Sequence, residues 1–304
     1  MFRFAKEQKI FDIAGVKVGG QPGILPTVMI GSIFYHKDKL VRDEKTGDFD
    51  KKAAEEILNK EQEISSKTGN PRIVDVCASY PQAFEKFIDF VADRVEGPFC
   101  IDGTTADVRM AGAKYVMENG LSKRVIYNSI SPEIKEDEIL AIKEAGIKSA
   151  ILLLLNTKNP LISGKLEVID ELLHKASMAG VENILIDTAT FDILDPGPSG
   201  KAIYLVKEKY GYPAGCGAHN AIEIWHIRKK LSPETRFSST LVANILPVIM
   251  GANFMLYGPI EAANKIYIPV ALANAYVAYT MWQEYGVKPL TDNHPFYNLH
   301  KIAT

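Results

Sequence analysis

Short apolar runs rich in β-branched residues alternate along the chain with longer segments in which apolar residues recur every three or four positions. From residue 27 onward there are eight such runs: 27–34, 72–79, 98–104, 124–130, 149–156, 183–189, 213–219 and 253–258. A continuous apolar run followed by a helical pattern is typical of a parallel strand and its crossover helix. Eight such units without a composition break predict an α/β fold, a (β/α)8 TIM barrel formed by residues 1–304, rather than a doubly wound open sheet.

The boundaries of the helical segments agree with this pattern. Glycines that can close successive helices stand at Gly69, Gly120, Gly146, Gly180 and Gly211. After the seventh predicted strand two helical stretches follow, 220–231 and 235–251, so one connection carries an extra helix. Residues 1–26 hold glycines and prolines among short apolar pieces, which predicts a hairpin or irregular strand covering the floor of the barrel.

Composition narrows the function classes. The formal net charge is -2 and charged residues make up 24% of the chain, so we expect no bulk attraction to nucleic acid. The amino terminus lacks the apolar core and cleavage pattern of a signal peptide, and three widely spaced cysteines do not form a disulfide framework. Both features predict a cytoplasmic protein in a reducing compartment.

The most apolar stretch, residues 266–282, lies near the carboxyl end and contains Pro269 and Asn274. It is shorter than a membrane-spanning helix, so the chain is not expected to be integral to a membrane. The stretch predicts a buried helix or a helix at a homodimer interface.

Polar residues stand at the carboxyl ends of five predicted strands, where the active site of such a barrel lies. They are Asp75, Asp102, Asn128, Asp187 and Asn220. Alternation along a strand places Asp75 on the face of Cys77, Asp102 on that of Cys100, and Asn220 on that of Cys216. A single Asp at a strand end can instead cap the next helix. Five polar groups at corresponding depth favour a binding site for a flat heterocycle with an amidine-like edge, since carboxylates accept paired N–H bonds and amides both donate and accept.

Several segments carry a family resemblance: KIFDIAGVKVGGQPG, PTVMIGSIFY, DFDKKAAEEI, TGNP, DGTTADVRMAGAKY, YNSISPEI and LYGPIE. Together they resemble the H subunit of tetrahydromethanopterin S-methyltransferase and its bacterial relatives, the methylcorrinoid:tetrahydrofolate methyltransferases of quaternary-amine degradation, such as that of glycine betaine. The similarity covers essentially the whole chain. The segment FDILDPGPSGKAI stands where a longer insertion is expected in the methanogen protein, which favours the folate-using branch.

This resemblance implies methyl transfer between a methylated corrinoid, a methylcobalamin carried by a partner corrinoid protein, and N5 of the small-molecule pterin tetrahydrofolate. By similarity to pterin-binding barrels, Asp75, Asn128 and Asp187 would hold the pyrimidine edge of the pterin, with Asp102 close by. Asn220 would approach N5 and Asp102 would tune the proton network, which makes these two the candidate catalytic residues. His219 precedes Asn220, but alternation points it away, so a structural role is expected.

Other functions remain possible from the sequence. Inward thiolates of Cys77, Cys100 and Cys216 could bind zinc, but no C-x2-C pair is present and no metal is expected on this chain. The chain could instead be a tetrahydromethanopterin-dependent component that works only within a membrane complex. Dihydropteroate synthase needs phosphate-binding Arg and Lys at late strand ends, and LYGPIE matches this poorly; nucleotide-binding glycine motifs are absent from the sequence.

Overall fold

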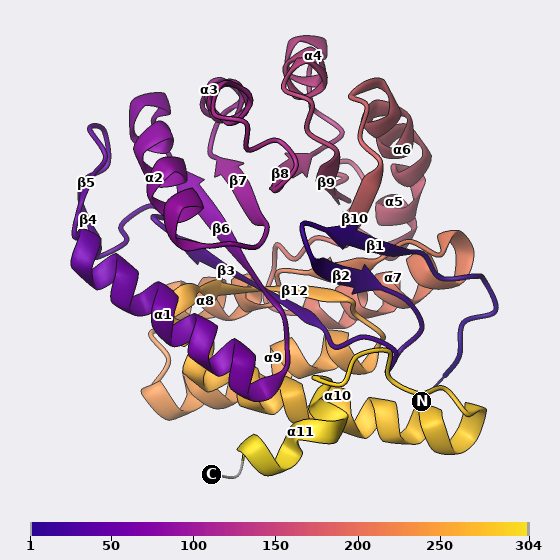
Figure 1. Cartoon of the computed structure of the whole chain (residues 1–304). Helices are drawn as coiled ribbons and strands as arrows, with labels where there is room; N and C mark the ends of the chain where they lie inside the picture. The colour runs from indigo at the N-terminus through magenta and orange to yellow at the C-terminus, as the bar shows by residue number, and fades with distance from the viewer. Residues whose placement is uncertain (1, 303–304) are drawn as a thin grey trace.

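A closed ring of parallel strands forms the centre of the protein. The computed structural model describes residues 2–302. Within them the ring consists of β3 (Val28–Ile33), β6 (Arg72–Ala78), β7 (Phe99–Gly103), β8 (Val125–Ile130), β9 (Ser149–Leu153), β10 (Asn183–Asp187), β11 (Ala214–Cys216) and β12 (Phe254–Pro259). Each strand pairs with its neighbours in sequence order and β12 pairs with β3, which closes the barrel (Figure 1). The predicted TIM barrel is confirmed, and each of the eight apolar runs corresponds to one strand.

Helices surround the ring (Figure 1). They are α1 (Lys51–Thr68), α2 (Pro81–Arg94), α3 (Ala106–Glu118), α4 (Glu136–Glu144), α5 (Ile162–Glu167), α6 (Ile169–Met178), α7 (Pro196–Tyr210), α8 (His219–Lys229), α9 (Pro233–Ile249), α10 (Ala263–Tyr285) and α11 (Pro295–Ile302), with a short 3-10 helix at Ile260–Ala262. The extra helix predicted after the seventh strand is present, as the pair α8 and α9. Gly69 and Gly211 end α1 and α7 in the left-handed conformation, with φ of 81° and 70°.

Alternation along the strands separates two apolar layers. One set of residues, such as Ile73, Cys100 and Ile126, fills the interior of the barrel, and the other set packs under the helices. The amino-terminal segment forms an antiparallel hairpin of β1 (Ile10–Ile13) and β2 (Val16–Gly19). Its Ile13 and Val18 pack against interior residues from the first positions of the strands, so this end of the barrel is filled by apolar side chains.

A second hairpin, β4 (Val41–Asp43) and β5 (Asp48–Phe49), follows β3 and was not predicted. Its strands are three and two residues long, too short to produce a period of two in a charged segment. Phe49 anchors the hairpin by packing edge-on against Phe34, with ring centroids 4.7 Å apart. The hairpin thereby fixes the segment that leaves β3.

Helix α10 contains the apolar stretch predicted at residues 266–282. Its inner face, which includes Ile266 and Val270, is buried against the barrel. On the outer face Tyr276, Tyr279 and Trp282 keep 62%, 48% and 42% of their surface exposed. Within residues 2–302 no helix is both long enough and apolar enough to cross a membrane.

Candidate active site

A cavity of about 390 Å³ lies at the carboxyl ends of the strands, at the end opposite the β1–β2 hairpin. Its walls are Ser32, Tyr35, Asp75, Cys77, Asp102, Asp187, Gly217, His219, Asn220, Glu223, Leu256, Gly258 and Pro259. Four of the five predicted site residues therefore surround one space. The fifth, Asn128, does not line the cavity but contacts Asp75 from β8.

Asp75 is a fully buried carboxylate that accepts hydrogen bonds from Ser32, Asn128 and the thiol of Cys77. The Ser32 hydroxyl donates to Oδ2 at 2.8 Å, and the Asn128 amide donates to Oδ1 at 3.1 Å. Burial raises the pKa of Asp75, and these hydrogen bonds act in the opposite direction. Because both oxygens already accept a hydrogen bond, Asp75 is fixed in orientation before any ligand arrives.

Asp102 lies beside Asp75 but has few partners. The thiol of Cys77 is 3.9 Å from Asp102 Oδ2 and 3.6 Å from Asp75 Oδ2. Burial, followed by the charge of Asp75, raises the pKa of Asp102 to about 8, while the more distant Arg109 lowers it. Since Asp75 has the stronger donors, we expect Asp102 to be the member of this pair that holds a proton more readily. The cavity would then present a carboxylate next to a neutral carboxylic acid.

Asp187 ends β10 on the other side of the cavity. Its Oδ1 accepts a hydrogen bond of 2.7 Å from the amide of Ala189, which adopts a positive φ of 59°. The buried Lys165 holds this turn by donating to the carbonyls of Thr188 and Ala189 at 2.9 and 2.7 Å. Burial raises the pKa of Asp187 to about 6. One oxygen is therefore committed to the backbone, and the other has no hydrogen bond among the described residues.

Asn220 reaches the cavity for a different reason from the one predicted. Strand β11 ends at Cys216, which packs in the outer layer under the helices, so alternation does not bring Cys216 or its face inward. Helix α8 begins at His219, and Asn220 reaches the cavity from its first turn. Gly217 leaves room for it, since a Cβ there would lie 3.2 Å from the Asn220 amide nitrogen.

The expectation that His219 points away from the site is wrong. Because the residue belongs to a helix and not to a strand, its ring turns toward the cavity and lines it. Its Nδ1 lies 2.9 Å from the carbonyl oxygen of Leu256 on β12. Burial lowers the pKa of His219 below its usual 6.5.

The three cysteines do not meet. Cys100 fills the barrel interior, Cys216 lies in the outer layer, and Cys77 alone lines the cavity. A zinc site made of all three thiolates is therefore excluded. Ligand atoms of Asp75, Cys77 and Asp102 lie within 4.8 Å of one another, and Asp75 also accepts hydrogen bonds from Ser32 and Asn128.

Sequence reasoning missed three polar residues that line the cavity, Ser32, Tyr35 and Glu223. Tyr35 follows β3 directly, and its aromatic ring offers a flat surface to a planar ligand. The position just past a strand end was the only signal. Glu223 lies one helical turn after His219 on α8, where a reading based on strands could not place it.

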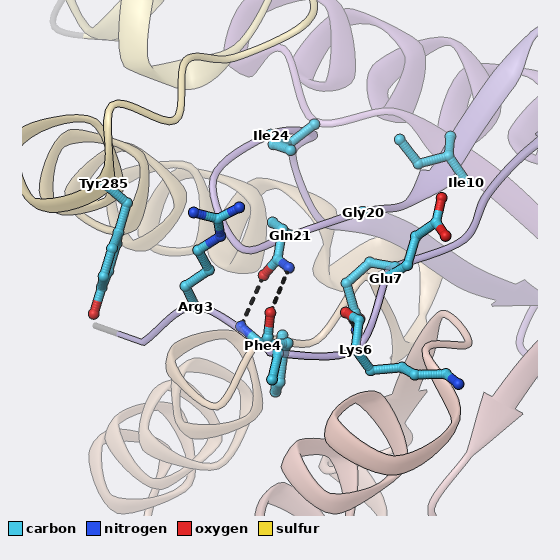
Figure 2. Close-up of a pocket in the computed structure, with 11 residues that line it drawn as sticks. Arg3, Phe4, Lys6, Glu7, Ile10, Gly20, Gln21, Ile24 and Tyr285 are labelled. Carbon is cyan, nitrogen blue, oxygen red and sulfur yellow. Dashed lines mark hydrogen bonds between the residues drawn. The ribbon is translucent and has the colours of Figure 1, made fainter.

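A larger cavity, of about 770 Å³, lies elsewhere. It is bounded by the amino-terminal segment, the turn at Gly20–Ile24 and Tyr285 (Figure 2). Gln21 exchanges two hydrogen bonds of 2.9 Å with the backbone of Phe4 across it. None of the predicted site residues lines this space, so size alone does not identify the reactive site.

Comparison with known proteins gives the family. Residues 6–290 match the family model described as tetrahydromethanopterin S-methyltransferase MtrH subunit. The H subunit of this enzyme from Methanothermobacter thermautotrophicus is 37% identical over 98% of this chain and 100% of that protein. Its counterpart from Methanocaldococcus jannaschii is 38% identical, again over 98% of this chain and 100% of that protein.

Solved structures support the fold. Dihydropteroate synthase from Yersinia pestis aligns with a TM-score of 0.64 at 11% identity, covering 88% of this chain and 98% of that one. The enzyme from Xanthomonas albilineans, in complex with 7,8-dihydropteroate, aligns with a TM-score of 0.60 at 16% identity, covering 92% and 99%. At these identities the likeness concerns the barrel alone. The sequence matches, by contrast, span nearly the full length of both proteins, and this chain belongs to the MtrH family of tetrahydromethanopterin S-methyltransferase subunits.

Proposed function

We propose that this protein transfers a methyl group between N5 of a reduced pterin and a corrinoid carried by a partner protein. The observation that carries the proposal is the convergence of Asp75, Asp102, Asp187 and Asn220 on one cavity in a chain of this family. The similar proteins are named for tetrahydromethanopterin, so this pterin takes precedence over the tetrahydrofolate favoured by the FDILDPGPSGKAI segment. Tetrahydrofolate and the betaine-type role become the second candidate.

The cavity suits the pyrimidine edge of a pterin in size and chemistry. A volume of about 390 Å³ is in the range of small-molecule sites. The pterin edge carries adjacent N–H donors, and a carboxylate such as Asp75 or Asp187 accepts such donors in pairs. Asn128 then acts through Asp75, which it orients, and Asn220 is left to approach N5 from α8.

The reaction requires the protein to align the two reactants and to accept or supply a proton at N5. Methyl transfer is a displacement at carbon, in which the N5 electron pair forms the new bond while the electron pair of the old bond leaves with the corrinoid. N5 then loses a proton, and in the reverse direction N5 must be protonated before it can leave. Asn220 can hydrogen-bond to N5 in both protonation states because its amide donates and accepts. Asp102 would serve as the neighbouring proton reservoir.

The partners follow from the same proposal. The methylated corrinoid is the second substrate and has to reach N5 from outside, and the exposed side chain of Asn220 is compatible with an accessible rim. Three free cysteines suit a reducing compartment, so we place the activity in the cytoplasm. We also propose that the protein forms a homodimer through the exposed aromatic face of α10. Sedimentation of the purified protein would test this.

The experiment is an anaerobic assay with methylcobalamin and either tetrahydromethanopterin or tetrahydrofolate, followed through the corrinoid spectrum. Conversion of methylcobalamin with one pterin supports methyl transfer and identifies the pterin. Reaction only when methylcobalamin is bound to a corrinoid protein would favour a protein that depends on its complex. No transfer under any of these conditions would overturn the proposal.

A further inference from the structure

His219 presents one nitrogen to the protein and the other to the cavity. A carbonyl oxygen can only accept a hydrogen bond, so the contact of 2.9 Å to Leu256 requires the proton to be on Nδ1. In a neutral ring Nε2 then carries a lone pair. None of the hydrogen bonds among residues 2–302 involves this Nε2, and the residue lines the cavity.

Strand β12 is shaped to receive this ring. Its register against β3 shifts between Leu256 and Gly258, and Gly258 has a φ of 91°, a conformation that favours glycine. A Cβ at Gly258 would lie 2.5 Å from His219 Cδ2 and 2.9 Å from Nε2. The ring therefore lies directly against the Gly258 backbone, in a space that any larger residue would fill.

The irregularity in β12 is itself anchored. Tyr257, between the two positions, is 1% exposed and donates a hydrogen bond of 2.6 Å to the buried Glu61. Glu61 in turn pairs with Arg72 at 3.3 Å. This buried network fixes the backbone that supplies the Leu256 carbonyl, and so it fixes the tautomer and the direction of the His219 ring.

We propose that Nε2 of His219 is the proton acceptor for N5 of the reduced pterin. The inference rests on the proposed methyl transfer. When the N5 electron pair takes the methyl group, N5 becomes a cation that still carries its hydrogen, and that proton passes to Nε2. In the opposite direction the protonated ring returns the proton to N5, and the electron pair of the breaking N–C bond stays on nitrogen. Asn220, the next residue, orients N5 during both steps.

Burial of the ring favours its neutral state at rest, and the acidic groups that face it act in the opposite direction. The titratable groups on the walls of the cavity are Glu223 on α8, Tyr35 after β3, Asp75 and Cys77 on β6, Asp102 on β7 and Asp187 on β10. Burial lowers the pKa of His219, and the Leu256 carbonyl and Glu223 offset part of this effect. The ring is thus neutral at pH 7 and able to accept a proton, and it loses this ability as the pH falls through its pKa.

The test compares His219→Asn with wild type. The asparagine amide can still donate to Leu256 but provides no base at the Nε2 position. We expect the rate of pterin methylation to fall about 100-fold, in the range that general base catalysis supplies, with little change in KM for the pterin. The loss of rate at low pH that we expect for the wild type should be absent in this variant. His226→Asn, on the same helix but away from the cavity, is the matched control and should keep the wild-type rate and pH profile.

Two further measurements distinguish the loss of a base from poor folding of the variant. Imidazole added to His219→Ala should restore part of the rate, which a structural role would not explain. Nitrogen NMR of the wild-type ring should show Nδ1 protonated and Nε2 unprotonated at pH 7. A wild-type rate and pH profile in His219→Asn, or a proton on Nε2 in the resting protein, would overturn the inference. Absence of methyl transfer by the wild type would instead refute the proposed function, while the NMR result would still decide the tautomer.

Discussion

Two acidic groups in this protein both have a raised pKa but have opposite surroundings, and Glu61 is fully buried whereas Asp102 is partly buried. Glu61 lies between α1 and the barrel, where burial raises its pKa to about 7, but its carboxylate accepts hydrogen bonds from Tyr257 and Tyr267 and pairs with Arg72. Asp102 also has a raised pKa, about 8, yet its one hydrogen bond among the described residues comes from the Cys77 thiol. A raised pKa therefore does not identify a functional site by itself. An acid that has few hydrogen-bond partners and lies at the carboxyl end of a strand does indicate such a site.

The comparison predicts opposite effects on stability. Glu61→Ala should lower the free energy of unfolding by about 3 to 5 kcal/mol, because it removes the ion-pair partner of the mostly buried Arg72 and the acceptor of two buried tyrosine hydroxyls. Asp102→Ala should leave it unchanged or raise it, because it removes a partly buried acid that lacks strong partners. Denaturant unfolding measures both, with Glu61→Gln as the milder control. A large loss in Asp102→Ala would show that this residue is structural.

The second prediction concerns Asp187, whose free oxygen faces the cavity. Asp187→Asn should weaken pterin binding about 10-fold to 100-fold, because one charge-assisted hydrogen bond to the pterin edge is replaced by a mismatched amide. Isothermal titration measures the affinity, and Asp170→Asn, an exposed position on α6, is the matched control. Unchanged affinity in Asp187→Asn would remove this residue from the proposed site.

The barrel was predictable because its strands are buried on both faces and read as continuous apolar runs. The strands Ser149–Leu153 and Val125–Ile130 lie wholly inside the predicted ranges. The inward positions of Asp75 and Asp102 were also predictable, because both lie within regular strands where alternation holds.

The part of the site that α8 supplies was not predictable, for a physical reason. Strand alternation holds only as far as Cys216, where β11 ends, and a helix starts at His219. The segment GCGAHN is too short for a hydrophobic period to show this change. Alternation beyond Cys216 therefore predicts the position of Asn220 for the wrong reason and the wrong side for His219. The β4–β5 hairpin was missed because strands of three and two residues leave no pattern.

The third prediction uses the proton on Asp102. Its pKa is about 8 in the folded protein against an ordinary 3.8, so between these values the folded state binds more protons than the unfolded state. The contribution of this group to stability is therefore present at low pH and is lost as the pH rises toward 8, by at most about 1.4 kcal/mol per pH unit. The free energy of unfolding is measured against pH for the wild type and for Asp102→Asn, and the difference between the two curves isolates the effect of Asp102. A flat difference between pH 5 and 8 would mean that Asp102 is already ionised at neutral pH.

The smallest expected effect comes from a donor to the carboxylate beside Asp102. Ser32→Ala removes the hydrogen bond of 2.8 Å to Asp75 Oδ2, while Asn128 still holds Oδ1. We expect pterin affinity to fall only about 2-fold to 10-fold, because Ser32 acts through Asp75 and Asn128 still orients that carboxylate. The same substitution frees an oxygen of Asp75 to compete for the proton, so the pKa of Asp102 should move closer to that of Asp75. If Ser32→Ala lowered the affinity for the pterin as much as Asp187→Asn does, the serine itself would contact the pterin. Ser32 would then belong to the groups that bind the ligand and not to those that only orient Asp75.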